Sequence, residues 1–129
     1  MPMNRKHIEV VAAVIKYKNL YLLVQRPFKG EVGGKWEFPG GKIEPGETHS
    51  DALLREIKEE LNMSISVSNH ILTKLHSYNT FNLKIHFYEC NVSNNELQLK
   101  EHLNFVWVEK TQINFYELAS ADVEVVALL

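Results

Sequence analysis

Apolar residues fall along the chain mostly in short runs and alternations, the pattern of β-strands. Residues 8–15 and 20–24 are almost continuously apolar, and Tyr17, Lys18 and Asn19 separate them as a turn. This pattern predicts a hairpin whose strands are buried on both faces. The second hairpin expected from the sequence joins residues 71–78 and 83–92, where Lys84 and His86 alternate with Ile85 and Phe87 and indicate a half-exposed face.

Shorter segments add to this sheet. Arg26-Pro27 ends the second strand, because proline removes a backbone donor, and residues 29–35 form a glycine-rich surface loop that we expect to be mobile. Three further strands are predicted, at residues 36–38, 97–99 and 105–108. Residues 111–118 are expected to form a short helix or turn.

One longer segment has the periodicity of a helix. Leu53, Ile57 and Leu61 recur at helical spacing from about His49 onward, and Thr48 stands where the N-cap of such a helix belongs. Asn62 stands where it should end, and asparagine follows glycine as the preferred residue in a left-handed C-terminal position. A second helix is expected over residues 121–129. We therefore predict an α/β (α+β) fold, with a mixed sheet sandwiched between the long helix and the C-terminal helix.

Composition and charge limit the possible functions. The chain has 129 residues, a formal net charge of −2 and one cysteine, Cys90, which we interpret as a buried strand residue. These values predict a single domain over residues 1–129, no nucleic-acid groove, and a cytoplasmic protein. The N-terminal residues 1–10 lack a signal-peptide pattern, and no membrane segment is expected. The six histidines are scattered without ligand spacing, so we predict no zinc site.

The expected helix carries three carboxylates on one face. Glu56, Glu59 and Glu60 have i, i+3 and i+4 spacing, which places them in one sector of a helix. Like charges at this spacing repel one another, so the face is either a solvated surface, with Arg55 pairing to Glu59, or a site completed by cations. Hard divalent ions such as Mg²⁺ prefer oxygen ligands that they share with substrate phosphates.

The sequence around these glutamates resembles the Nudix box, G-x5-E-x7-R-E-U-x-E-E-x-G-U, where U is apolar. Read from Gly41 to Met63, eight of the nine specified positions match, and Asn62 replaces the final glycine. The residues from Trp36 to Lys42, and Glu101-His102 with Trp107, are similar to the MutT branch of the Nudix hydrolases, which includes the CTP pyrophosphohydrolases. We treat Asn62 as conservative for catalysis, because asparagine tolerates a positive φ.

The resemblance implies a Nudix fold and a metal centre for Mg²⁺ or Mn²⁺. Its implied ligands are the carbonyl of Gly40 and the carboxylates of Glu56, Glu59 and Glu60, with Glu101 as a further ligand. Glu59, Glu60 or Glu101 would be the general base, and the choice among them stays open. Glu47 and Arg55 would form an ion pair that holds the glycine loop on the helix. For Glu101, an exposed glutamate without a function is an equal alternative.

The substrate-binding residues are expected outside the box. Asp122 matches the segment in which MutT carries a base-reading asparagine, although Ser120 or Asp122 could instead cap the helix. The other candidates are Arg26, Phe28, Gly41, Lys42 and Tyr78. The alternative for the two basic residues is an ordinary surface charge, and for the two aromatic residues it is packing.

These features together predict a Mg²⁺-dependent nucleoside triphosphate pyrophosphohydrolase. Its substrate class would include 8-oxo-dGTP or CTP and dCTP, with a monophosphate and pyrophosphate as products, and the protein would be a monomer or homodimer. Two alternatives stay open: a non-catalytic nucleotide-binding Nudix module, and a hydrolase of ADP-ribose or another nucleoside diphosphate derivative. The complete set of box glutamates argues against the non-catalytic module.

Overall fold

The computed structural model describes residues 5–129. The expectation that residues 1–10 lack a signal peptide therefore lies partly outside the described residues. The elements in chain order are β1 (Lys6–Tyr17), β2 (Leu20–Gln25), β3 (Trp36–Glu37), β4 (Gly40–Lys42), α1 (His49–Leu61), β5 (Ser66–Ser77), β6 (Phe81–Asn91), β7 (Asn104–Val108) and the 3-10 helices η1 (Lys110–Phe115), η2 (Ser120–Asp122) and η3 (Glu124–Leu128).

The predicted mixed sheet is confirmed, and it is built around β1. Its main strand order is β3-β2-β1-β6-β5, with β4 also pairing to β1 and β7 to β2. The first hairpin is confirmed, but β1 and β2 pair only at their tip, at Lys16↔Tyr21 and Tyr17↔Leu20. Over its length β1 instead runs parallel to β6, from Lys6↔Phe81 to Lys16↔Asn91. This central position explains why the apolar run of β1 is continuous rather than alternating.

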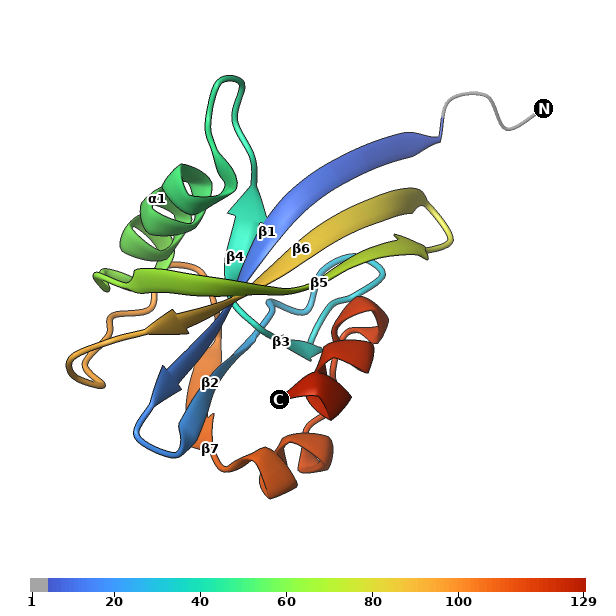
Figure 1. The fold of residues 1–129 in the computed structure, drawn as a ribbon. Helices are drawn as coiled ribbons and strands as arrows, with labels where there is room; N and C mark the ends of the chain where they lie inside the picture. Colours follow the sequence, from blue (N-terminus) through green and yellow to red (C-terminus); the bar gives the residue numbers. More distant parts are fainter. Residues whose placement is uncertain (1–4) are drawn as a thin grey trace.

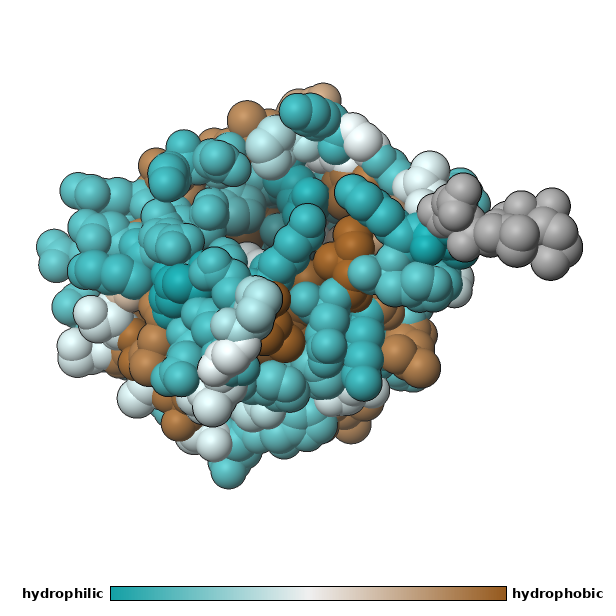
Figure 2. All heavy atoms as spheres, turned by 90° about the horizontal axis from the view of Figure 1, so that it is seen from above, coloured by the Kyte–Doolittle hydropathy of each residue, from teal (hydrophilic) through white to brown (hydrophobic). Residues whose placement is uncertain are grey.

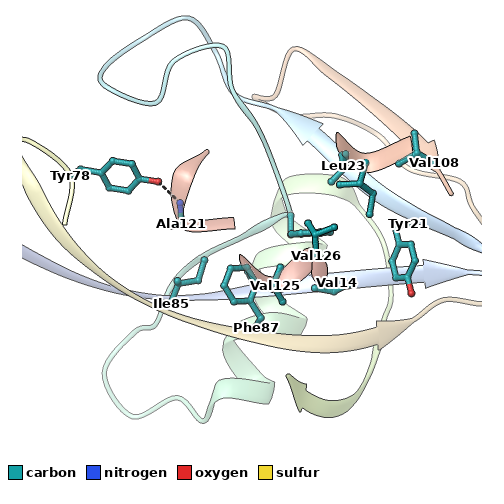
Figure 3. Packing of buried hydrophobic residues seen from close by; sticks show 13 residues of the cluster. Val14, Tyr21, Leu23, Tyr78, Ile85, Phe87, Val108, Ala121, Val125 and Val126 are labelled. Atoms are coloured by element: carbon teal, nitrogen blue, oxygen red, sulfur yellow. Dashed lines mark hydrogen bonds between the residues drawn. The ribbon is translucent and has the colours of Figure 1, made fainter. Parts of the chain in front are cut away.

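The sheet lies between α1 and the C-terminal 3-10 helices (Figure 1), and a hydrophobic cluster packs on each of its faces. On one face Val11, Ala13 and Ile15 of β1 pack with the buried stripe of α1. On the other face Ala12 and Val14 of β1 belong to the cluster that the C-terminal 3-10 helices cover. Val125, Val126 and Phe87 of β6 are members of this second cluster (Figure 3).

The helix α1 begins and ends where the sequence predicts. The Thr48 hydroxyl accepts a hydrogen bond from the backbone N–H of Asp51 at 3.0 Å, which is the expected N-cap. Asn62 adopts the left-handed conformation, with φ of 54°, and its N–H donates to the carbonyl of Lys58. Asparagine thus occupies the left-handed position that ends the helix.

Four predicted segments need correction. The glycines 40 and 41, for which no strand is predicted, belong to β4, because their backbone pairs with β1. Residues 97–99 form no strand, since the N–H groups of Gln98 and Lys100 donate to the carbonyls of Leu61 and Glu60 at the end of α1. The expected C-terminal α-helix is instead the pair η2 and η3. Finally, β5 begins at Ser66, before the predicted residue 71, with a register shift near His70.

Figure 2 shows the molecule from above relative to Figure 1. This surface is mostly hydrophilic, with smaller hydrophobic areas between polar residues. In the described part of the chain, the helices are too short or too polar to span a bilayer. Cys90 is buried in β6, as predicted, and burial raises the pKa of its thiol to about 12.

Candidate active site

The site begins at β4, where the backbone approaches two other groups closely. A Cβ on Gly40 would lie 1.9 Å from the carbonyl oxygen of Val11, so the strand pairing leaves no room for a side chain. A Cβ on Gly41 would lie 2.2 Å from the carboxylate of Glu56 on α1. The two glycines therefore bring the backbone of β4 against both the sheet and the first of the three helix glutamates.

Arg55 connects the turn after β4 to α1. Its guanidinium donates to Glu47 at 2.6 and 2.8 Å and to the carbonyl of Lys42 at 3.0 Å. It also donates to Glu56 at 2.9 Å and to Glu59 at 3.3 Å. The hydrogen bonds to Arg55 lower the pKa of Glu47 to about 2, and those same bonds raise the pKa of Arg55. The structure thus contains the expected contact between Glu47 and Arg55.

The three helix glutamates have different surroundings. Burial raises the pKa of Glu56, whose side chain is 14% exposed, against the opposing effect of Arg55. The Glu59 side chain is half exposed, and Glu60 lines a cleft. Since Arg55 binds Glu56 and Glu59, their mutual repulsion is partly neutralised, while Glu60 is left facing the cleft.

The cleft has a volume of about 460 Å³, within the range of small-molecule sites. Its polar part includes Gly40, Gly41, Lys42, Glu60 and Glu101, all predicted site residues. Its apolar part comes from β1, β6, the residue after β3, the turn before β6 and the residue before η2. The lining residues of this second part include Val10, Ala12, Phe38, Tyr78, Phe81, Leu83, Ile85 and Ala119.

Asp122 lies at the apolar part of the cleft. Its side chain is 3% exposed, and its carboxylate accepts a hydrogen bond from the N–H of Phe38 at 2.8 Å. Burial and the nearby charge of Glu37 raise the pKa of Asp122 well above its usual value. The alternative that Asp122 caps its own helix is wrong, because η2 has no side-chain cap.

The other predicted substrate residues differ in position. Arg26 lines the cleft and pairs with Glu37 at 3.2 Å. Tyr78 also lines it, but its ring is buried and its hydroxyl accepts the N–H of Ala121 at 3.0 Å, a contact drawn in Figure 3. Phe28 is 80% exposed and is not among the residues that line the cleft, so the structure does not bring it to the site.

Sequence reasoning missed the role of Glu37 in the cleft wall. Besides Arg26, its carboxylate contacts Nε2 of His102 at 3.2 Å. Among residues 5–129, the buried side-chain atoms Arg26 Nε and His102 Nδ1 find no hydrogen-bond partner. Glu37 follows directly after Trp36 in a strand, and no local pattern marks it as different from an ordinary strand glutamate.

The histidines are scattered along the sequence, but two of them meet in the structure. The structure brings His49 and His86 together with Glu9, and the ligand atoms of these three lie within 4.8 Å of one another. None of the three is among the residues that line the cleft. No local pattern of the sequence indicates this group, because its members come from β1, α1 and β6.

Comparison with known proteins decides the family. The sequence model of the NUDIX domain matches residues 10–128. The chain belongs to the Nudix family. It is 36% identical to the CTP pyrophosphohydrolase of Escherichia coli over 92% of this chain and 87% of that protein. It is 37% identical to the 8-oxo-dGTP diphosphatase of Proteus vulgaris over 77% of this chain and 89% of that protein.

A solved structure agrees with the fold. The solution structure of the ORF135 protein of Escherichia coli is 35% identical, with a TM-score of 0.80 over 96% of this chain and 89% of that one. The expected Nudix fold is therefore confirmed. The chain has the mixed sheet and the helix carrying the Nudix box that the sequence predicts.

Proposed function

We propose that this Nudix protein is a nucleoside triphosphate pyrophosphohydrolase of the MutT type, which forms a nucleoside monophosphate and pyrophosphate. The observation that carries the proposal is the composition of the cleft. Gly40, Glu60 and Glu101 line it together with Asp122, so groups suited to a metal–phosphate complex and to a base share one cavity. The names of the relatives, a CTP pyrophosphohydrolase and an 8-oxo-dGTP diphosphatase, support this substrate class.

Mg²⁺ or Mn²⁺ fits the donor set at the polar part. The carbonyl of Gly40 and the carboxylates of Glu56, Glu59 and Glu60 would hold it, with Glu101 as a further ligand. All these donors are oxygen atoms, which hard divalent ions prefer. Because Gly41 has no side chain, the Glu56 carboxylate can occupy the space beside it. When bound, the cation neutralises phosphate charge and lowers the pKa of a coordinated water.

The residues of the chain then have separate tasks. Glu59, Glu60 or Glu101 accepts a proton from the water that attacks phosphorus, while the P–O bond between the α- and β-phosphates breaks to give the monophosphate and pyrophosphate. Lys42, exposed beside the cleft, offers a positive charge to the phosphates. Glu47 and Arg55 hold the turn after β4 against α1, which fixes the positions of the groups that touch the substrate.

The base would occupy the apolar part of the cleft. Asp122 is the buried polar group there. A carboxyl that accepts one backbone N–H can still form hydrogen bonds with the edge of a nucleobase. Its raised pKa favours the protonated form, which both donates and accepts hydrogen bonds. Arg26 and Tyr78 shape the same cavity, Tyr78 through packing rather than an open ring face. The match of the family over residues 10–128 supports one domain for the whole chain.

A substrate panel tests the proposal. Turnover of 8-oxo-dGTP, dGTP, CTP, dCTP and ADP-ribose with Mg²⁺ would be followed by separating the nucleotide products. We expect one or more of the triphosphates to yield monophosphate and pyrophosphate, and ADP-ribose to be a poor substrate. Preferential turnover of ADP-ribose, or binding of triphosphates without turnover, would contradict the proposal.

A further inference from the structure

A second group of ligand-type side chains lies outside the catalytic cleft. Glu9 of β1 and His86 of β6 are on adjacent strands, and His49 is the first residue of α1. His86 Nε2 lies 2.6 Å from Glu9 Oε2, and the rings of His49 and His86 have centroids 4.2 Å apart. One ligand atom from each residue falls within 4.8 Å of the others.

We propose that Glu9, His49 and His86 form a second cation site, for a divalent transition-metal ion of the Zn²⁺ type. Two imidazole nitrogens and one carboxylate oxygen match the three-ligand sets that bind Zn²⁺ and leave a fourth position for water. Mg²⁺ prefers oxygen ligands, so this site differs in chemistry from the catalytic one. The inference does not depend on the proposed function.

Hydrogen bonds with neighbouring hydroxyls orient both imidazoles. His86 Nδ1 lies 2.8 Å from the Thr73 hydroxyl, which leaves Nε2 directed at Glu9. His49 Nδ1 lies 2.7 Å from the Tyr88 hydroxyl, which leaves Nε2 as its available nitrogen. A hydrogen bond from the second ring nitrogen is the usual way in which proteins fix a metal-binding histidine.

The site is open to solvent at Glu9 and buried at His86. His86 is 6% exposed, whereas the Glu9 side chain is 49% exposed and gives an ion a route from solvent. Tetrahedral Zn²⁺ needs ligand atoms about 3.3 Å apart, given metal–ligand bonds of about 2.0 Å. Side-chain rotations of Glu9 and His49, with His86 as the anchor, would close the present spacing to that value.

The surrounding charges set the strength of the site. Glu9 is the one carboxylate of the group, and Lys84 on the same face of β6 partly opposes its charge. His70 of β5, which bonds to Thr73 through Nε2 at 2.7 Å, adds a third imidazole nearby. Burial and the charge of His86 lower the pKa of His49, which favours its neutral, metal-binding form.

Zn²⁺ titration of the full-length protein tests the proposal. The titration is followed by calorimetry in excess Mg²⁺, which competes at the oxygen-ligand site, and by NMR of the histidine rings. We expect one equivalent of Zn²⁺ to bind and to shift the ring signals of His49 and His86, with those of His7 and His102 unchanged. Absence of saturable binding, or shifts at His102 without shifts at His49 and His86, would overturn the site.

Three variants assign the binding to these residues. Glu9→Gln keeps the size of a half-exposed side chain but removes the charged ligand, and should weaken Zn²⁺ binding on the order of ten-fold or more. Lys84→Gln removes a positive charge near Glu9 and should therefore strengthen Zn²⁺ binding. A variant that merely folds less well would not bind Zn²⁺ more tightly. His7→Gln, an exposed histidine of β1 outside the group, is the matched control and should change nothing. Equal affinity in all four proteins would refute the proposal.

Discussion

Arg55 donates two hydrogen bonds to Glu47, from Nε at 2.6 Å and from Nη2 at 2.8 Å. The pair closes the turn between β4 and α1, and the same guanidinium binds the carbonyl of Lys42. A lysine at position 55 could supply the charge but not this fixed fork of donors. Within the Nudix box, the pair therefore holds in place the start of the helix segment that carries Glu56, Glu59 and Glu60.

The Glu47–Arg55 pair makes stability dependent on pH. The folded-state pKa of Glu47, about 2, lies below its unfolded value, so the pair stabilises the protein above the unfolded pKa and loses this effect as pH falls toward 2. We expect Glu47→Gln to lower the urea midpoint at pH 7, and the difference from wild type to vanish near pH 2. Glu44→Gln is the control, because Glu44 contacts Arg55 at 3.1 Å but is 56% exposed. An equal loss in both variants would contradict the special role of Glu47.

Alanine at the two glycines of β4 should have different effects. In Gly41→Ala the new Cβ meets the movable Glu56 carboxylate, so we expect a folded protein whose kcat falls by at least about ten-fold, as a misplaced functional group commonly causes. In Gly40→Ala it meets the carbonyl of Val11, and we expect a lower melting temperature. Melting curves and kcat measured on both proteins check this contrast. Unchanged turnover in Gly41→Ala would argue against a role for the position of Glu56.

The local parts of the site could be predicted from sequence, because their chemistry depends on spacing along one helix. Glu56, Glu59 and Glu60 share a face of α1 by periodicity alone, and Asn62 marks the end of that helix. Spacing does not distinguish the three glutamates from one another. The structure does, because Glu60 lines the cleft while Arg55 binds Glu56 and Glu59.

The missed features depend on tertiary contacts. The strand character of Gly40 and Gly41 comes from pairing with β1, which overrides the low strand propensity of glycine. Residues 97–99 alternate like a strand, yet Gln98 binds the end of α1 instead. The grouping of Glu9 with His49 and His86 follows from the parallel pairing of β1 with β6, which no local pattern reveals.

Asp122 should affect both stability and nucleotide preference. Its folded-state pKa is raised above the unfolded value of about 3.9, so its contribution is fully present below that value and is lost as pH rises through the folded pKa. Asp122→Asn keeps an acceptor for the N–H of Phe38 without a buried charge. We expect this variant to melt higher than wild type at pH 8, with a smaller difference at pH 4.

The same variant tests recognition of the base. If Asp122 contacts the base edge, Asp122→Asn should change the ratio of kcat/KM between two triphosphates by about ten-fold, the worth of one hydrogen bond. Glu124→Gln, at an exposed position of η3, is the control. A variant with altered stability but the same ratio for every nucleotide pair would limit Asp122 to a structural role.

The most direct test of the account measures pyrophosphate released from the preferred triphosphate, with and without Mg²⁺, in wild type, Glu59→Gln and the control Glu96→Gln. Glu59 lies on the charged face of α1, whereas Glu96 is exposed in the segment after β6. We predict Mg²⁺-dependent release by wild type and Glu96→Gln, and a loss of at least about 100-fold in Glu59→Gln, as expected for a residue of the reacting site. Equal release by all three proteins, or release that persists without a divalent cation, would contradict a Nudix site built on the glutamates of α1.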